Sequence, residues 1–413
     1  YSQMAFLSLL DDRAKPKGSR DPLGFELVWS HYGRQVIGNL TTVTASLNNF
    51  AVALVGFQWA NELHAHLPEH ERQIRIRDSF LRYEQLTGYL RHIANETDIM
   101  GITRVKRRVD EVNGKLSFGM GADQQILSDQ ASYGLWGLYS AAMRETGLVR
   151  GANRTPTDTG DFIAHEIEKR LDKEQLIAMF MSDRKVQRDD LESFALPYRS
   201  AIRNTKMQEQ LLHTLMNGHQ DQLLQQEMWR VTQAVAKSNT KEMSVPRFIK
   251  HVKRRTRQVK LEQRLSSIES VERILVAANN IFHYCRRKDG EPLNAILEAL
   301  SNRYSYAHLP ETMDLSGVPR ADILTSILHS LLANNVGDAL NHVLELNRVV
   351  MDQRGGAPWV EIEGGDTLRV RVQSETTELR DQTYLEEGWD YDYFLGSFIR
   401  IANDGLGAGW KLR

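Results

Sequence analysis

The strongest chemical signal in the sequence is a run of positive charge near the middle of the chain. Between positions 247 and 264 there are eight basic residues and one acid, Glu262. The basic residues are Arg247, Lys250, Lys253, Arg254, Arg255, Arg257, Lys260 and Arg264. On one continuous helix most of them share a face, and Phe248, Val252 and Val259 lie opposite. The run therefore predicts a helix that packs one face and presents a cationic face to the phosphates of nucleic acid.

Further basic residues extend the predicted nucleic-acid contacts. They are Arg104, Lys106, Arg107 and Arg108 in a second cluster, and Arg144, Arg150 and Arg154 in a separate segment. Beyond Leu265 apolar residues take over the angular sector that the basic residues used, which predicts a kink near Ser266 or a change of partner surface. The alternative is a solvated charged face that pairs with acids elsewhere in the chain.

The common motifs of enzyme active sites do not occur in the sequence. It has no Walker loop, no dinucleotide-binding glycine motif and no Gly-x-Ser-x-Gly elbow. His251 and Lys253 begin a phospholipase-D-like pattern, but Gln258 stands where that pattern needs aspartate. The carboxylates of 361–363 lack the lysine that a strand-borne nuclease site requires, and Cys285 lies among aromatic residues typical of a core. A non-catalytic protein is favoured, and an enzyme with a site assembled from distant residues stays open.

One group of histidines has spacing that suggests a metal site. His64, His66 and His70 lie within seven positions, and the last two would share a face of one helix. Pro68 falls between them and makes a continuous helix doubtful. We therefore expect a polar turn between two helices, with no metal and no cofactor.

Composition and charge limit the remaining classes. The 413 residues carry 52 Lys and Arg against 53 Asp and Glu, for a net charge of −1, so binding to a polyanion must depend on local patches. The single cysteine excludes an internal disulfide and a cysteine metal cluster. The longest apolar run, 50–57, is too short to cross a bilayer, and no signal peptide is evident. We expect a cytoplasmic protein with no membrane partner.

Periodicity predicts a mainly α protein with small β elements. The expected helices span 23–38, 41–66, 68–92, two or three helices within 189–243, 244–287, 291–303, 319–351 and 389–403. Alternating apolar and polar residues on both sides of Gly364-Gly365-Asp366 predict a β-hairpin over 359–372.

Residues 138–171 carry a local pattern of their own. Gly147 ends a helix, Leu148 and Val149 begin an extended segment, and Thr157 can cap a helix whose apolar face includes Ile163 and Ile167. With Gly147-Leu148-Val149 and Thr157-Asp158-Thr159-Gly160, the segment resembles the winged-helix superfamily over about 124–175. The resemblance implies a compact module that binds DNA or protein.

The segment departs from the DNA-reading members of that superfamily. The stretch that corresponds to their recognition helix, 132–146, has Arg144 as its only basic residue, and the wing has Arg150 and Arg154. Base-specific reading is therefore not favoured. A winged helix that binds protein and a helical hairpin in the core remain alternatives.

These observations predict a multi-domain helical protein with a winged-helix-like module and a small C-terminal β-hairpin. The predicted divisions are 1–122, the module 123–183, a region 184–289 with the basic helix, and 290–413. The predicted function is non-specific binding of a DNA or RNA backbone by a non-catalytic subunit, together with other protein subunits, in a prokaryotic-type DNA-processing or anti-phage defence complex. The alternatives are a scaffold or adaptor without nucleic acid, and a nuclease or metal-dependent enzyme.

Overall fold

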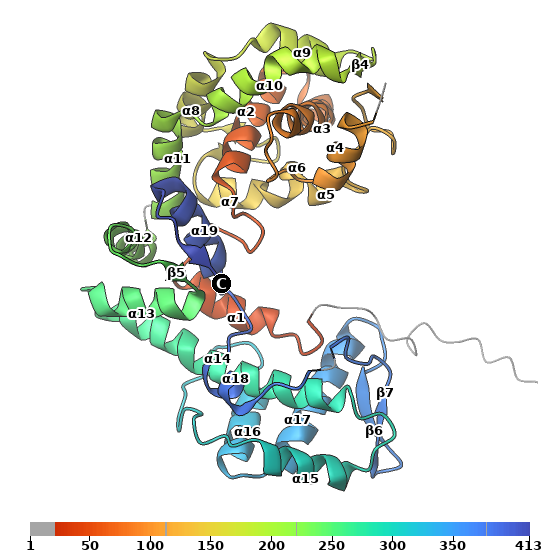
Figure 1. Ribbon diagram of the computed structural model, residues 1–413, viewed down its shortest axis with the longest axis vertical. Helices are drawn as coiled ribbons and strands as arrows, with labels where there is room; N and C mark the ends of the chain where they lie inside the picture. Colours follow the sequence, from red (N-terminus) through yellow and green to blue (C-terminus); the bar gives the residue numbers. More distant parts are fainter. Residues whose placement is uncertain (1–20, 112–113, 220, 377) are drawn as a thin grey trace, which may run out of the picture. The chain divides into compact units, whose positions relative to one another are not determined.

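The computed structural model describes residues 21–111, 114–219, 221–376 and 378–413 (Figure 1). It is mainly helical and multi-domain, as predicted, and its described strands form four two-stranded sheets. The chain divides into two compact units. The large unit comprises Val36–Leu261 and Phe394–Arg413, and the small unit comprises residues 21–35 and Glu262–Tyr393. This division is coarser than the four predicted segments and has different boundaries.

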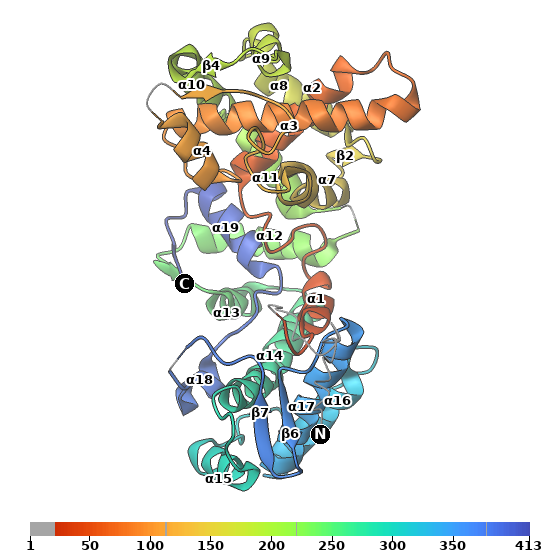
Figure 2. The same ribbon diagram turned by 90° about the vertical axis from the view of Figure 1, so that its right-hand side faces the viewer.

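The large unit is built around two long helices, α2 (Leu47–Leu63) and α3 (Glu69–Ile93). The side chain of Ser46 caps α2 by accepting from the backbone N–H of Asn49, at 3.2 Å. Most of α2 is buried on every side, as its continuous apolar sequence predicts. Pro68 immediately precedes α3, so the proline between the histidines ends one helix and begins the next. α3 packs along α2 and is the long orange helix in Figure 2.

Shorter helices surround this pair. They are α4 (Ile102–Val109), α5 (Gln130–Tyr133), α6 (Leu135–Leu138), α7 (Ser140–Glu145), α8 (Asp158–Glu168), α9 (Lys173–Met181), α10 (Arg188–Ile202), α11 (Thr205–Asn217), α12 (Leu223–Ala236), α13 (Val245–Arg255) and α19 (Leu395–Leu406). The strand pairs are β1 (Lys115–Leu116) with β4 (Val186–Gln187), β2 (Val149–Arg150) with β3 (Thr155–Pro156), and β5 (Glu242–Met243) with β8 (Lys411–Leu412). β5 and β8 pair in parallel, and the other two pairs are antiparallel.

The small unit holds the predicted hairpin. β6 (Val360–Glu363) pairs with β7 (Thr367–Val370) in antiparallel register, with Ile362 opposite Leu368. Gly364 and Gly365 at the turn both take positive φ, which a residue with a Cβ rarely adopts. The helices of this unit are α1 (Glu26–Arg34), α14 (Val259–Cys285) from Glu262 onward, α15 (Leu293–Arg303), α16 (Ala321–Leu332), α17 (Val336–Gln353) and α18 (Gln382–Glu387). The hairpin is labelled in Figure 2.

Two of the predicted helices are interrupted. The helix expected over 244–287 is wrong, because α13 ends at Arg255 and α14 begins at Val259. The kink expected near Ser266 is also absent, since Ser266 lies inside α14. The segment 319–351 is likewise split, with a break at 333–335 where Asn334 takes a φ of 54°.

The last predicted helix starts later than expected. Residues 389–393 precede α19 and are held by contacts to α14 instead. The carboxylate of Glu272 accepts from the hydroxyl of Tyr393 at 2.5 Å and from the backbone N–H of Asp390. Burial raises the pKa of Glu272 to about 7. The ring of Tyr393 is fully buried.

The glycine of the Thr157-x-x-Gly160 motif has a steric role. The hydroxyl of Thr157 accepts from the backbone N–H of Gly160 and donates to the carbonyl of Gly147 at 2.6 Å. A Cβ at Gly160 would lie 2.1 Å from the carbonyl oxygen of Leu148. The first turn of α8 can therefore approach β2 only because position 160 has no side chain.

Gly160→Ala is expected to lower the free energy of unfolding of the protein by about 1–3 kcal/mol, because the backbone must move to relieve this overlap. Urea denaturation measures the change. Thr159→Ala, an exposed position in the same turn, is the control and should change stability by about 0.5 kcal/mol or less. If the two variants are equally stable, the approach of position 160 to the carbonyl of Leu148 does not affect stability.

Candidate nucleic-acid interface

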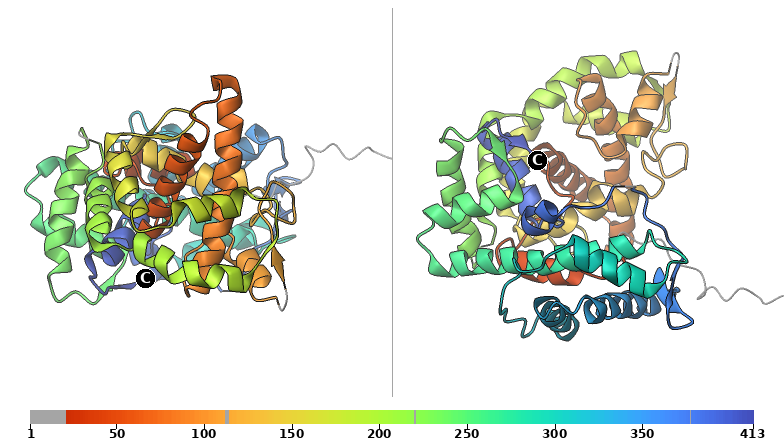
Figure 3. Two further views of the ribbon diagram at one scale, coloured as in Figure 1. Left: turned by 90° about the horizontal axis from the view of Figure 1, so that it is seen from above. Right: turned by 60° about the horizontal axis from the view of Figure 1, so that its bottom comes forward.

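The candidate interface is centred on α13, whose start follows from local sequence. The hydroxyl of Ser244 accepts from the backbone N–H of Arg247 at 3.5 Å, and Pro246 occupies the first turn. Phe248 and Val252 are fully buried, as predicted. α13 packs against α12 and α19, and the rings of Phe248 and Phe398 lie 5.8 Å apart. One face of α13 is thus fixed in the core of the large unit. α13 is labelled in Figure 1, and Figure 3 gives two further views of the same ribbon.

The opposite face of α13 lines a pocket of about 600 Å³. Arg247, Lys250, His251 and Arg254 follow one another at the i, i+3, i+4, i+7 spacing of a single helix face. The other lining residues come from the segment before the helix and from β5, namely Asn239, Thr240, Lys241 and Glu242. The lining therefore has four cationic side chains, one histidine and one carboxylate.

That carboxylate is already engaged. Glu242 contacts Arg247 at 3.2 Å through Oε2 and Arg413 at 2.9 Å through Oε1. Within the described ranges, neither Lys250 nor Arg254 has a carboxylate at ion-pair distance. Both side chains are exposed, so their charge is available to an external anion.

His251 reports the local electrostatic environment. Burial lowers the pKa of His251 below its ordinary value, and the cations Arg255, Arg254, Arg247 and Lys250 lower it further. Nδ1 of His251 also lies 3.1 Å from a guanidinium nitrogen of Arg255. The shift has the direction expected beside several cations.

The basic run does not form the single ridge that was predicted. Arg257 lies in the connection between the two helices, while Lys260 and Arg264 belong to α14. Lys253 and Arg255 flank the pocket face of α13. Val259, predicted to pack opposite the cations, is 67 % exposed, because the helix break removes it from the packed face.

The break between α13 and α14 is held by Glu227, an acid distant in the sequence. Oε1 of Glu227 in α12 accepts from the backbone N–H of Arg257 at 3.1 Å and from the hydroxyl of Thr256 at 3.0 Å. The same carboxylate binds the guanidinium of Arg230 at 2.7 and 2.8 Å. These contacts hold the pKa of Glu227 down at about 2, with the Arg230 hydrogen bonds as the main cause. Glu227 was not among the predicted site residues.

The second basic cluster, on α4, has a mixed role. Arg104 and Arg108 donate to backbone carbonyls of Gln124 and Gln125, so they hold the loop that follows α4. Lys106 and Arg107 are exposed. Of the four basic residues in this cluster, Lys106 and Arg107 are therefore the two whose side chains can contact an external nucleic acid.

The three arginines of the winged-helix-like segment also differ. Arg144 and Arg150 are exposed. The guanidinium of Arg154 lies 3.8 Å from the ring centroid of Trp136 and donates to the hydroxyl of Ser140 at 2.8 Å. Burial, with Arg144 nearby, lowers the pKa of Arg154 to about 10. Arg154 therefore stabilises the turn between β2 and β3.

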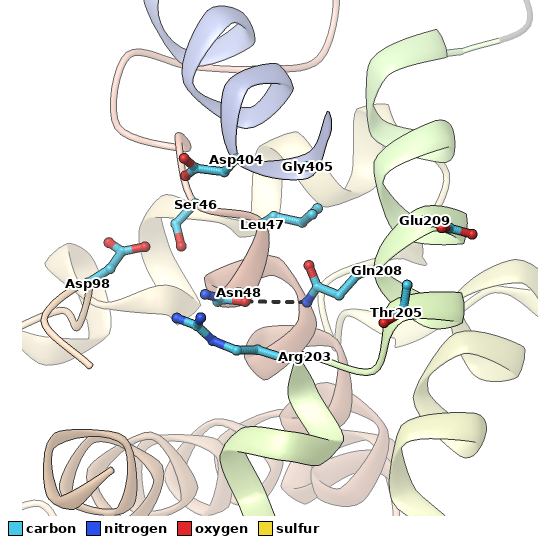
Figure 4. Close-up of a pocket in the computed structure, with 10 residues that line it drawn as sticks. All are labelled: Ser46, Leu47, Asn48, Asp98, Arg203, Thr205, Gln208, Glu209, Asp404 and Gly405. Atoms are coloured by element: carbon cyan, nitrogen blue, oxygen red, sulfur yellow. Dashed lines mark hydrogen bonds between the residues drawn. The ribbon is translucent and has the colours of Figure 1, made fainter. Parts of the chain in front are cut away.

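A second pocket in the large unit, of about 540 Å³, has the opposite character (Figure 4). Asp98, Glu209 and Asp404 line it together with Arg203. The guanidinium of Arg203 is bound to Glu96 at 2.8 Å. Burial and nearby Asp98 raise the pKa of Asp404. This pocket could not be predicted from local sequence, since its residues come from four separate segments.

The three histidines lie where α2 ends and α3 begins, with His70 in the first turn of α3. His64 lies at the end of α2, and its Nε2 is 2.6 Å from the hydroxyl of Ser79. Across the described ranges, no three His, Cys, Asp or Glu side chains gather in a way that could hold a metal ion.

Cys285 is fully buried, and burial raises the pKa of its thiol to about 12. Of the helices in the described part of the chain, none has the length and apolar character needed to span a bilayer.

The local elements of the winged-helix-like segment form as expected. The turn after α7 has Gly147 at a φ of 77°, β2 and β3 make a short hairpin, and Thr157 caps α8. These elements are the ones that the motif of Gly147-Leu148-Val149 and Thr157-Asp158-Thr159-Gly160 predicts. The relation to the winged-helix superfamily rests on that sequence resemblance. The chain as a whole matches no protein-family model, no curated protein and no solved structure.

Proposed function

We propose that the exposed face of α13 binds the phosphate backbone of DNA or RNA without reading its sequence. One observation carries the proposal. Lys250 and Arg254 stand on a helix face held in place by the buried opposite face, and no described carboxylate neutralises them. Arg247, Lys253 and Arg255 add positive charge along the same helix. Cations on a rigid helix lose little conformational freedom on binding, which favours contacts to successive phosphates.

The overall charge of the protein makes this binding a local and salt-dependent effect. With a net charge of −1, long-range attraction is weak and most of the free energy must come from counterion release at the contact. About three to five phosphate contacts would give a slope of about −3 to −4.5 in log affinity against log salt.

The test is retention of a duplex of arbitrary sequence at low salt, followed by a salt titration. Lys250→Glu combined with Arg254→Glu is expected to weaken binding at least 100-fold and to reduce the salt slope by about two, because two cations become anions. Lys185→Glu, an exposed lysine elsewhere in the large unit, is the matched control and should change affinity little. The proposal is wrong if the wild-type protein fails to retain the duplex at low salt.

Binding is also expected to depend on pH through His251. A bound polyanion offsets the positive potential of Arg247, Lys250, Arg254 and Arg255, so it raises the depressed pKa of His251. A group whose pKa rises on binding takes up a proton, and the affinity therefore increases as pH falls from 8 to 6.

The expected change between pH 8 and pH 6 is several-fold and at most about tenfold per unit shift in pKa. Fluorescence anisotropy with a labelled duplex measures it, at constant ionic strength. His251→Gln should bind with little pH dependence over the same range. An unchanged pH profile in that variant would assign the effect to another group.

The same proposal includes the wider role expected from the sequence, a subunit of a DNA-processing or anti-phage defence assembly in the cytoplasm. That role requires a partner protein in addition to nucleic acid. Affinity purification of the wild-type and Lys250→Glu, Arg254→Glu proteins separates the two requirements. A partner protein that both the wild type and the double variant retain would bind outside α13. If the double variant releases the partner and the wild type binds no duplex, the scaffold alternative is favoured.

A further inference from the structure

The pocket beside α13 is distinct from the rest of the basic run. Arg247, Lys250, His251 and Arg254 converge on one concave space, together with Lys241 from the segment before the helix. Lys253, Arg255, Arg257 and Lys260 do not line it. Lys250 and Arg254 thus belong both to the exposed cationic face of α13 and to this pocket, whereas the other four cations belong to the basic run alone.

The pocket lining is suited to a compact dianion. Four cations and only one carboxylate line it, and Glu242 already binds Arg247 and Arg413. The hydroxyl of Thr240 and the amide of Asn239 add neutral hydrogen-bonding groups. A phosphomonoester carries about −1.5 to −2 charges and three acceptor oxygens, so it can meet several donors at once.

A phosphodiester inside a strand fits this lining less well. It carries one charge, and the chain continues from it on both sides, so cations can approach it only from the open side. The cations of this pocket come from a helix face and from the segment before the helix. A phosphate attached to the rest of its molecule through one oxygen can approach both sets of cations at once.

We propose that this pocket binds the terminal phosphate of a nucleic-acid strand, an inference that rests on the proposed function. Lys250 and Arg254 contact the phosphate oxygens, and Lys241 completes the cationic wall. The remaining cations of α13 and the start of α14 contact the adjoining backbone. The protein then prefers strand ends, nicks or gaps that carry a phosphate over uninterrupted duplex.

The experiment compares short single strands of one sequence that differ only at their ends. One strand carries a 5′-phosphate, one a 3′-phosphate and one has hydroxyl groups at both ends, and binding is followed by anisotropy of an internal label. One of the phosphorylated strands is expected to bind about tenfold more tightly than the hydroxyl strand. Adenosine 5′-monophosphate serves as a competitor, which distinguishes a strand end from a free nucleotide.

Variants assign the preference to the pocket. Lys250→Gln and Arg254→Gln are expected to reduce the ratio of the two affinities to near one, because they remove donors to the terminal phosphate. Lys260→Gln is the matched control, an exposed lysine of the basic run outside the pocket. It should weaken binding of both strands in equal proportion and leave the ratio unchanged.

The outcomes separate the two proposals. Equal binding of phosphorylated and hydroxyl strands overturns the inference and leaves the proposed function standing. Failure of these strands and of the duplex to bind overturns the proposed function and the inference with it, whereas binding of the duplex alone overturns only the inference. Competition by the mononucleotide as strong as that by the phosphorylated strand also overturns the inference, because the pocket would then recognise a free nucleotide.

Discussion

Glu96→Ala is expected to lower the free energy of unfolding by about 3–5 kcal/mol, the largest loss of stability that we predict. Glu96 and Arg91 form an ion pair at 2.6 Å with side chains only 2 % and 3 % exposed. Arg203 adds a second contact to Glu96 at 2.8 Å. Removing the carboxylate leaves the guanidinium of Arg91 buried with only the oxygens of Asn49 and Asp98 as acceptors. A buried charge without its counter-ion is costly.

Urea denaturation at neutral pH measures this loss, with an unchanged dependence on denaturant as the sign that the folded state is otherwise the same. Glu209→Ala is the control, since Glu209 is an exposed acid of α11 in the same unit. That variant should change stability by about 0.5 kcal/mol or less. Equal effects of the two substitutions would contradict the importance of the buried pair. A double variant, Arg91→Met with Glu96→Leu, should recover much of the loss, because no charge is then left buried.

Glu227→Gln is expected to lower the free energy of unfolding by about 2 kcal/mol at pH 7, since its main partner Arg230 is half exposed and solvent screens part of the interaction. The pKa of Glu227 lies at about 2 in the folded protein, from an ordinary value of 4.5, and its side chain is 8 % exposed. Because this pKa is depressed, the ionised group stabilises the fold above pH 4.5, and the stabilisation is lost as the pH falls from 4.5 to 2. The difference between wild type and variant should therefore shrink on acidification.

Unfolding curves at pH 7 and pH 3 measure that difference. Glu262→Gln, which neutralises an exposed acid at the start of α14, should show no comparable loss at either pH. A constant difference between wild type and Glu227→Gln across the range would mean that the lost stability is not electrostatic. Since Glu227 holds the connection after α13, the same variant should also weaken binding of a duplex.

Local sequence was sufficient for elements whose signals lie within a few residues. Pro68 predicted the start of α3, the glycines at 364 and 365 predicted the hairpin turn, and Thr157 predicted the cap of α8. The buried face of α13 was also predicted, because Phe248 and Val252 recur at helical spacing. In each case the residues that determine the structure are neighbours in the chain.

Features that depend on distant residues could not be predicted. The end of α13 depends on Glu227, which lies 30 positions before Arg257 and gives no local sign of its role. The basic pocket depends on 239–242 and on Arg413, which engages its only carboxylate. Arg104 and Arg108 looked equivalent to Lys106 in sequence, yet they hold loop carbonyls. Charge alone does not reveal which cations are already engaged.

Each of the two units is formed from two separate stretches of the chain, so neither can fold completely until its second stretch has been synthesised. The large unit includes α19, and Phe398 of that helix packs against Phe248 and Trp229. On the ribosome, α2 to α13 must therefore wait for α19 to emerge before their core closes, and the small unit waits for 389–393. Until then Trp229 of α12 and Phe248 of α13 lack their contact with Phe398. Cutting the gene at one point would not yield either unit intact.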